Sequence, residues 1–324
     1  MAGKLSVGII GGGFGTTGLL PAFKSIPGCT VVGVCAHRSG WKEFLQRTDL
    51  DAVAIAVPPA AQYAITKLAI TKGLHVFAEK PLAANVAQAK ELLTLAKKRR
   101  IVHGIDFIFP EINAWQKVKE MLDKETFGAL KHVSVNWDWQ SGEDRFDKKT
   151  WRSDLKQGGG ALAFYFSHGL HYLEFFAGRI KNAKAIFAYS SKVTWAKDRG
   201  ETGFDVLLSF KNGVTGYAHV SSIVPGYVRH QLIFQCETGV IALETENAVV
   251  DHFTVTTYSH AGTKRIKVAE DKGRPGEDER VKSVRKLAKR FIDACAKGAP
   301  KEMRPSFEDG VRVQELIEEI RTKK

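Results

Sequence analysis

The stretch KLSVGIIGGGFGTTG, residues 4–18, decides the fold of the first half of the chain. A short apolar run, typical of a buried β-strand, leads directly into glycines and then into a helical segment. Gly11 and Gly13 fill the first two positions of the pattern G-x-G-x-x-G, and Thr16 stands in the third. Glycine permits the tight turn and lets backbone N–H groups approach a pyrophosphate at the helix start. Because it follows a strand, the pattern predicts a dinucleotide-binding loop, which Phe14 and Gly15 complete.

The segments that follow alternate between strands and helices. Apolar runs predict strands at 30–35, 52–57, 74–79 and 101–107, and amphipathic patterns predict helices at 62–73 and 85–100. Continuous apolar strands that alternate with helices indicate a parallel sheet covered on both faces. Only residues 36–51 connect the second strand to the third, too few for a full helix–strand–helix passage.

The second half follows a different pattern. HVSVNWDW, residues 132–139, alternates between apolar and polar side chains, and similar runs occur at 204–210, 214–220 and 229–236. The connections KNG (211–213) and ETG (237–239) suit tight turns. We therefore expect an open, largely antiparallel sheet in an α/β domain, followed by a polar loop at 269–280 and helices around 280–297 and 306–321. Trp137 and Trp139 lie on one face of their strand, and we expect them to supply an apolar surface for subunit contact.

Composition narrows the classes of function. The chain has 324 residues, a formal net charge of +13 and four cysteines without metal-ligand spacing, so we expect reduced thiols, no metal and a cytoplasmic protein. No apolar run is long enough to cross a bilayer, and the N-terminal residues show no signal-peptide pattern. The basic balance favours anionic ligands, but zinc-finger spacing and RNA-binding aromatic signatures are missing, so we expect neither a nucleic-acid nor a membrane partner.

The end of the second strand bears on the choice of cofactor. An acidic residue there would bind the ribose hydroxyls of NAD, but this chain has Ala36, His37, Arg38 and Ser39. Arginine and serine suit a 2′-phosphate, which favours NADP over NAD. A solvated arginine in a turn is the alternative interpretation.

A second informative stretch is GGGALAFYFSHGLHYLEF, residues 158–175. Phe164, His168, His171 and Phe175 recur at helical spacing and share one face. Two interpretations remain open: the histidines are core residues with backbone partners, or this face lines a cavity in which a proton is transferred.

Several stretches together resemble the Gfo/Idh/MocA oxidoreductase family, in the right order and over nearly the whole chain. They are GIIGGGFG, DAVAIAVPPAAQ, GLHVFAEKPLA, WRSDLKQGGGAL with SHGLHYLEFFAG, and PSFEDGVRVQELIEEI. The resemblance implies a dinucleotide-binding Rossmann domain, shortened after its second strand, and a C-terminal domain whose open sheet carries oligomer contacts. We place these domains at residues 1–120 and 121–324, with the final helix packing back at their interface. The resemblance also implies NAD(P)-dependent oxidation or reduction of sugars, sugar derivatives or polyols by a homodimer or homotetramer.

The family's motifs assign residues by position. Its E-K-P motif falls on Glu79, Lys80 and Pro81, and the histidine of its D-x-x-x-H motif falls on His168, with Phe164 in place of the aspartate. Lys80 and His168 are thus the expected catalytic residues. The resemblance implies further cofactor contacts at Val57, Pro58, Gln62, Glu79, Trp151 and Arg152, and substrate contacts at Asp106, Arg152, Tyr165 and His171.

The sequence leaves three functional interpretations. The first is hydride transfer between nicotinamide and a sugar-like hydroxyl or carbonyl. The second is a reductase of a non-sugar carbonyl or conjugated substrate, because the lost aspartate makes the site less polar. The third is a cofactor-binding protein without turnover, against which the presence of both Lys80 and His168 argues.

Overall fold

The computed structural model describes residues 4–37, 39–190, 199–246 and 250–323. The chain forms two compact units, residues 1–108 with 272–315 and residues 109–271 with 316–324. The first unit thus includes the helix expected near 280–297 and most of the last helix, which the sequence analysis placed in the second domain. The reason lies in packing, since the apolar face of that first helix contacts the helix that follows the glycine loop.

The first unit contains a five-stranded sheet in the order β2-β1-β3-β4-β5, in which all neighbours are parallel. β3 and β5 are buried along their whole length, as is most of β4, as expected for strands covered on both faces. The strands are β1 (Leu5–Ile10), β2 (Cys29–Cys35), β3 (Ala52–Ile55), β4 (His75–Ala78) and β5 (His103–Ile105). This confirms the predicted Rossmann-type sheet.

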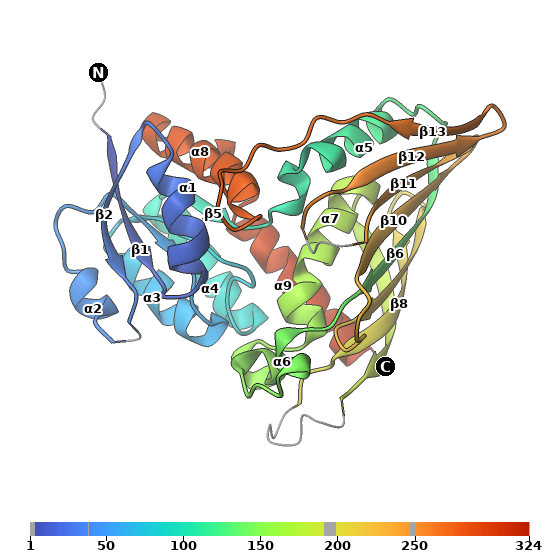
Figure 1. Cartoon of the computed structure of the whole chain (residues 1–324). Coiled ribbons are helices and arrows are strands. Elements are labelled where there is room, and N and C mark those ends of the chain that lie inside the picture. The colour runs from blue at the N-terminus through green and yellow to red at the C-terminus, as the bar shows by residue number, and fades with distance from the viewer. Residues whose placement is uncertain (1–3, 38, 191–198, 247–249, 324) are drawn as a thin grey trace. The chain divides into compact units, whose positions relative to one another are not determined.

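Helices cover both faces of this sheet (Figure 1). α1 (Leu20–Lys24), which follows a π-helical turn at Gly15–Leu19, lies beside α8 (Val281–Lys297), and α3 (Pro59–Thr71) lies beside α4 (Val86–Arg99). Among the described residues between β2 and β3, the helical structure is the single turn α2 (Trp41–Phe44), in line with the short connection expected. The last helix is α9 (Phe307–Thr322), preceded by a 3₁₀ turn at Pro300–Glu302.

The second unit contains an eight-stranded sheet in the order β13-β12-β11-β10-β6-β9-β8-β7. All neighbouring strands are antiparallel except β6 and β9, so the sheet is mixed and mostly antiparallel. The strands are β6 (Leu130–Asp138), β7 (Ile180–Ala188), β8 (Gly203–Phe210), β9 (Thr215–Ser221), β10 (Arg229–Cys236), β11 (Gly239–Thr245), β12 (Thr254–Ser259) and β13 (Gly262–Ile266).

Helices lie against one face of this sheet and leave the other face open (Figure 1). The long ones are α5 (Asn113–Asp123) and α7 (Ser167–Ala177). Shorter turns complete the unit: 3₁₀ turns at Phe109–Glu111, Trp151–Ser153 and Leu155–Gln157, the single turn α6 (Gly142–Arg145), and a π-helical turn at Ala161–Tyr165 directly before α7.

The two tryptophans of β6 do not lie on the open face, so the expectation that they supply a contact surface is wrong. Trp137 and Trp139 are 2% and 5% exposed, because the alternation of the strand directs them toward the helices. Trp137 stacks on His230 with ring centroids 4.2 Å apart. The open face carries other apolar side chains instead, namely Ile186 of β7 and Leu207 of β8, which are 78% and 64% exposed.

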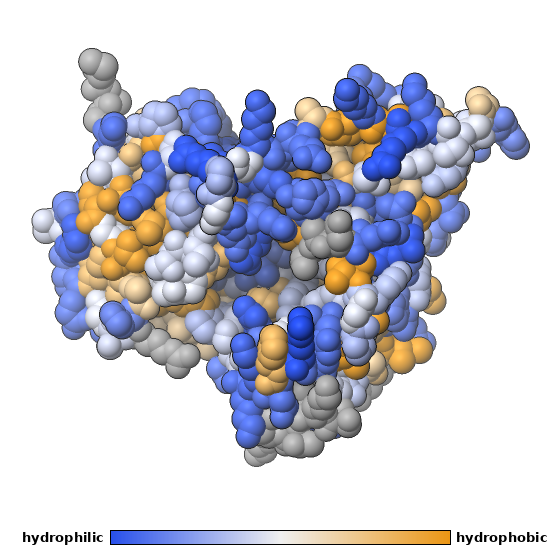
Figure 2. Space-filling view, viewed as in Figure 1, coloured by the Kyte–Doolittle hydropathy of each residue, from blue (hydrophilic) through white to orange (hydrophobic). Residues whose placement is uncertain are grey.

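The surface shown in Figure 2 is largely hydrophilic, with hydrophobic residues gathered in the region of β2 on the first unit. Among the helices of the described residues, none combines the length and the apolar character that a bilayer-spanning segment requires.

Candidate functional site

The glycine loop after β1 has a backbone that only glycine can adopt at its first position. Gly11 has a φ of +136°, and a Cβ there would lie 2.1 Å from the carbonyl oxygen of Ala56. Its N–H donates to the carbonyl of Cys35 at 2.9 Å, which ties the loop to the end of β2. Gly11 therefore serves the tight turn out of β1, as the sequence motif predicted.

The second glycine serves a different purpose. A Cβ on Gly13 would meet no atom within 4 Å, and Gly12 and Gly13 are both exposed, so the backbone here faces open space. Thr16 donates its hydroxyl to the carbonyl oxygens of Gly12 and Gly13, both at 2.9 Å, and so fixes the loop in place of the third glycine. Gly15, which is buried, begins the helical turn. An exposed backbone at a helix start fits the pyrophosphate of a dinucleotide.

An arginine that the sequence analysis did not single out lies on this loop. The guanidinium of Arg280 lies 4.0 Å from the ring centroid of Phe14, within the range of a cation–π contact. Asp278 holds it through two hydrogen bonds of 2.8 and 2.6 Å. Arg280 directly precedes α8, in the segment 269–280 that the sequence predicts as a polar loop, and no local pattern links it to the glycine loop.

The residues after β2 lie at the surface. His37 and Ser39 are exposed, and His37 accepts a weak hydrogen bond at its carbonyl from the Cys35 thiol. Arg38, the third residue predicted to contact the cofactor here, lies outside the described residues.

Gln62 has a clear structural partner in the segment that carries Lys80. It is fully buried on α3, and its side-chain amide donates to the carbonyl oxygens of Glu79, Pro81 and Leu82 at 2.6, 3.1 and 3.1 Å. This amide thus holds the chain on both sides of Lys80. Val57 and Pro58, which are half-buried, connect β3 to α3 on the same edge of the sheet.

Lys80 lies where β4 ends, beside two carboxyl groups. Ala78 of β4 pairs with Ile105 of β5, so the next residues of the two strands, Glu79 and Asp106, are neighbours. Asp106 is 2% exposed, and its burial, the charge of Glu79 and a hydrogen bond to Glu79 raise the pKa of its carboxyl well above the usual value. The charges of Lys80 and Arg280 act in the opposite direction on the same pKa.

In the second unit, the predicted histidine stripe spans two types of helix. Phe164 belongs to the π-helical turn Ala161–Tyr165, whereas His168 and His171 belong to α7. His168 is 8% exposed and packs edge-on against Phe109, with ring centroids 5.0 Å apart, whereas His171 is half-buried. The two histidines therefore share one α-helix, whereas Phe164 lies in the π-helical turn before it.

An ion pair between a buried carboxylate and a half-buried arginine fixes the start of this segment. Glu201 is 3% exposed and accepts hydrogen bonds from the N–H of Leu162 at 2.9 Å and from the Arg321 guanidinium at 2.7 Å. Arg321 also donates to the carbonyl of Gly159 at 2.9 Å. These contacts join three segments that are distant in sequence, so sequence patterns could not indicate them.

Arg152 and Tyr165 meet at one carboxylate, that of Glu143. Arg152 donates to it at 2.8 Å and lies 4.4 Å from the ring centroid of Phe164, while the Tyr165 hydroxyl lies 3.5 Å from its second oxygen. Burial, followed by the charge of Glu143, raises the pKa of Tyr165. Trp151 packs edge-on against Phe164 at 5.1 Å, so an aromatic ring occupies the position where the family has its aspartate.

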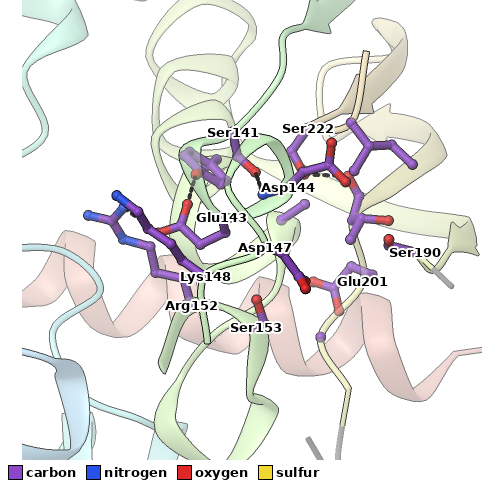
Figure 3. A pocket seen from close by; sticks show the side chains of 15 residues that line it. Ser141, Glu143, Asp144, Asp147, Lys148, Arg152, Ser153, Ser190, Glu201 and Ser222 are labelled. Carbon is purple, nitrogen blue, oxygen red and sulfur yellow. Dashed lines mark hydrogen bonds and ion pairs between the residues drawn. The ribbon is translucent and has the colours of Figure 1, made fainter. Parts of the chain in front are cut away.

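Figure 3 shows the pocket around this group, a cavity of about 40 Å³. Carboxylates and hydroxyls dominate its lining, and Lys148 and Arg152 are its basic side chains. Tyr165 and Arg152 both line the pocket, whereas His168 and His171 do not. The lining consists of Ser141, Glu143, Asp144, Asp147, Lys148, Arg152, Ser153, Ala161, Tyr165, Ser190, Gly200, Glu201, Thr202, Ser222 and Ile223. The described residues contain no group of three or more side chains arranged to hold a metal ion.

Comparison with known proteins identifies the family. The model of the oxidoreductase family with an NAD-binding Rossmann fold matches residues 5–107, and the model of the GFO/IDH/MocA C-terminal domain matches residues 115–242. The chain belongs to the Gfo/Idh/MocA family. It is an NAD(P)-dependent oxidoreductase by that membership, with a loop whose geometry fits the cofactor.

Relatives of this Gfo/Idh/MocA protein include an uncharacterized oxidoreductase of Synechocystis sp., 28% identical over 274 residues that cover 75% of this chain and 72% of the relative. A levoglucosan dehydrogenase, solved with NADH and levoglucosan, superposes with a TM-score of 0.82 at 18% identity and covers 99% of this chain and 97% of its own. A 3-ketoreductase from Actinomadura kijaniata, solved with NADP and TDP-benzene, superposes with a TM-score of 0.78 at 21% identity, covering 99% and 98% of the two chains. At these identities, the solved structures establish the fold alone.

The predicted site residues of this Gfo/Idh/MocA chain fall into two groups. The first unit brings together the glycine loop, the Lys80 segment and Asp106, which all lie at the carboxyl edge of the parallel sheet. The second unit holds Trp151, Arg152, Tyr165, His168 and His171. Sequence reasoning missed Glu143 and Glu201, which belong to no motif. It named Glu79 and Asp106 but not their adjacency, which follows because each directly succeeds the last residue of one of two paired strands.

Proposed function

We propose that this chain transfers a hydride between a nicotinamide cofactor and a hydroxyl or carbonyl of a sugar, sugar derivative or polyol. The observation that carries the proposal is the position of Lys80, which lies two residues after the end of β4, on the same edge of the sheet as the exposed backbone of Gly12 and Gly13. In open parallel sheets, ligands bind at this carboxyl edge. The bound cofactor supplies or accepts the hydride.

The proton chemistry falls to Lys80 and His168. In the oxidative direction, the imidazole of His168 takes the hydroxyl proton, and the ammonium of Lys80 polarises the substrate oxygen. Both types of side chain are suited to this work, since imidazole titrates near neutral pH and lysine presents a compact charge. The family motifs support these roles, and replacement of each residue tests them.

A sugar-like substrate has two kinds of support. The levoglucosan dehydrogenase was solved with an anhydro sugar, and a curated relative from Actinomadura kijaniata is a dTDP-3,4-didehydro-2,6-dideoxy-alpha-D-glucose 3-reductase. A non-sugar carbonyl is the second candidate, favoured by Phe164 and Trp151 where a carboxylate would otherwise lie.

We propose NADP as the preferred cofactor. The end of β2 carries no acidic side chain that would bind the ribose hydroxyls of NAD, and Arg38 and Ser39 offer a guanidinium and a hydroxyl to a 2′-phosphate. The solved relatives were crystallised with NADH in one case and NADP in the other, so both cofactors occur on this fold.

We further propose that the open face of the eight-stranded sheet joins copies of the chain into a homodimer or homotetramer. Ile186, Leu207 and Tyr258 are 78%, 64% and 43% exposed and supply its apolar contacts. Sedimentation at micromolar concentration should show an oligomer that Leu207→Lys weakens. A monomeric wild-type protein would contradict the proposal.

The decisive experiment begins with binding, measured by the fluorescence of NADH and NADPH, followed by a turnover screen with pyranoses, anhydro sugars, inositols and nucleotide-linked keto sugars. Once a substrate is identified, the turnover of Lys80→Met, of His168→Asn and of the double variant is compared with that of the wild type. The double variant should lose less than the sum of the two single losses, because the two groups act as a unit. Tight cofactor binding without turnover of any of these substrates would instead favour a sensor or a non-sugar reductase.

A further inference from the structure

A basic side chain reaches the glycine loop from a part of the chain that neither family model matches. Arg280 directly precedes α8, and its guanidinium lies 4.0 Å from the ring centroid of Phe14 in that loop. The two family models match residues 5–107 and 115–242, so neither includes Arg280. The loop and Arg280 nevertheless belong to the same compact unit, so the contact comes from the packing within this unit.

The packing of α8 holds Arg280 over the loop. Phe291 of α8 packs edge-on against Phe23 of α1 and Phe77 of β4, with ring centroids 6.2 and 5.7 Å apart. The helix also contacts the π-helical turn Gly15–Leu19, which directly follows Phe14. Because these contacts join α8 to the sheet and to the loop, the residue at the start of α8 has a fixed place.

The segment before α8 fixes the direction of the side chain. Asp278 accepts hydrogen bonds from the backbone N–H, Nε and Nη2 of Arg280, at 3.0, 2.8 and 2.6 Å. Arg285 in turn donates to the carboxylate of Glu277 at 2.7 and 2.8 Å. The Arg280 side chain is 42% exposed. A guanidinium carries five N–H donors, so the pair with Asp278 leaves donors for a ligand that approaches from solvent.

The ring of Phe14 is also held in place. A Cβ on Gly18 would lie 2.1 Å from this ring, so the ring covers the glycine. Arginine stacks on aromatic rings through its face, whereas its N–H donors point outward in its plane, so the contact does not use them. Phe14 directly follows Gly13, whose backbone faces open space. The guanidinium therefore lies beside the surface that fits the pyrophosphate of a dinucleotide.

We infer that Arg280 is a cofactor-binding residue, whose guanidinium hydrogen-bonds to the pyrophosphate at the glycine loop. The planar fork of arginine matches the oxygens of a phosphate group. Because Asp278 compensates the formal charge of Arg280, the contribution comes from directed hydrogen bonds rather than from net charge. The inference rests on the proposed function through the dinucleotide cofactor and is independent of the substrate.

The first experiment is a fluorescence titration of the full chain with NADH and with NADPH. Arg280→Gln should raise the Kd of both about tenfold to a hundredfold, because one hydrogen bond to a charged group is lost. Arg274→Gln removes one charge at an exposed position of the same segment, and as the control it should leave both constants unchanged. Wild-type affinity of Arg280→Gln for both cofactors would overturn the inference.

A second variant covers the case in which glutamine destabilises the segment, which thermal melting reveals. Arg280→Lys keeps a positive charge beside Asp278 but lacks the planar fork. It should raise both dissociation constants, though less than Arg280→Gln does. If Arg280→Lys bound both cofactors as tightly as the wild type, the fork would have no role and the inference would be overturned.

Competition with ADP-ribose locates the contact, because this ligand has the pyrophosphate but lacks the nicotinamide ring. Arg280→Gln should weaken ADP-ribose by the same factor as NADH. Equal affinity of ADP-ribose for the variant and the wild type would place the guanidinium at the nicotinamide half. A loss confined to NADPH would place it at the 2′-phosphate. Either result would overturn the inference.

These outcomes are distinguishable from a failure of the proposed function, because no titration needs a substrate. If Arg280→Gln weakens both cofactors while the wild type turns over none of the screened substrates, the proposed function fails and the inference stands. If the wild type turns over a substrate while Arg280→Gln binds both cofactors normally, the inference alone fails. A wild type that binds neither NADH nor NADPH would overturn both.

Discussion

Replacing Gly13 by alanine should weaken cofactor binding without weakening the fold. A Cβ at Gly13 meets no atom within 4 Å, and its φ lies outside the positive range, so alanine fits the loop as it stands. Gly→Ala at a compatible position stabilises a protein by about 0.4–1 kcal/mol through the unfolded chain. The melting temperature should therefore stay constant or rise slightly.

The effect on affinity follows from the space that the new methyl group occupies. It would lie on the open side of the loop, where backbone N–H groups must approach the pyrophosphate. Loss of one hydrogen bond to a charged group costs about 1.5–3 kcal/mol, which raises Kd roughly tenfold to a hundredfold. Fluorescence titration with NADPH and NADH measures this change, and thermal melting measures stability.

Two matched variants sharpen the test. Gly11→Ala places its Cβ 2.1 Å from the Ala56 carbonyl oxygen at a φ of +136°, so it should lower the melting temperature as well as the affinity. Gly273→Ala, where a Cβ also meets nothing within 4 Å, should change neither. If Gly13→Ala bound the cofactor as tightly as the wild type, the dinucleotide would not approach from the open side of the loop, and the reasoning would be refuted.

Four further outcomes are expected. Burial lowers the pKa of His103 to about 4, so its contribution to stability is complete above about pH 6.5, and about 3 kcal/mol is lost as the pH falls toward 4. NMR titration of the ring should show the lowered pKa, and His103→Gln should remove this part of the pH dependence of unfolding, whereas a ring that titrates near 6.5 would contradict it. Glu201→Ala removes the buried carboxylate that pairs with the half-buried guanidinium of Arg321 and should cost about 1.5–3 kcal/mol in urea unfolding. A loss below about 0.5 kcal/mol would show that the pair is dispensable. Arg38→Ala should weaken NADPH binding roughly tenfold to a hundredfold and NADH binding little, and equal wild-type affinities for both cofactors would contradict the NADP preference. His168→Asn should preserve fold and cofactor affinity but lower turnover by about two to four orders of magnitude; wild-type turnover would make it a core histidine.

Local patterns in the sequence were enough to predict the class and the order of the elements. Apolar runs of four to seven residues separated by amphipathic helices are sufficient for a parallel sheet, and clean alternation is sufficient for the mostly antiparallel one, because both periods are properties of the local backbone. The glycine loop could be placed for the same reason, since its backbone requirements at Gly11 are local. The position of Lys80 at a strand end also followed from pattern alone.

The covered face, the partners and the pKa shifts of the side chains depended on how the whole chain packs. Alternation showed that Trp137 and Trp139 share a face but not that helices cover it. Arg280 reaches Phe14, and Arg321 reaches Glu201, across segments that local periodicity cannot connect. The raised pKa of the Asp106 carboxyl depends on its burial and on the charge of Glu79, and both are properties of the packed chain rather than of any segment of it.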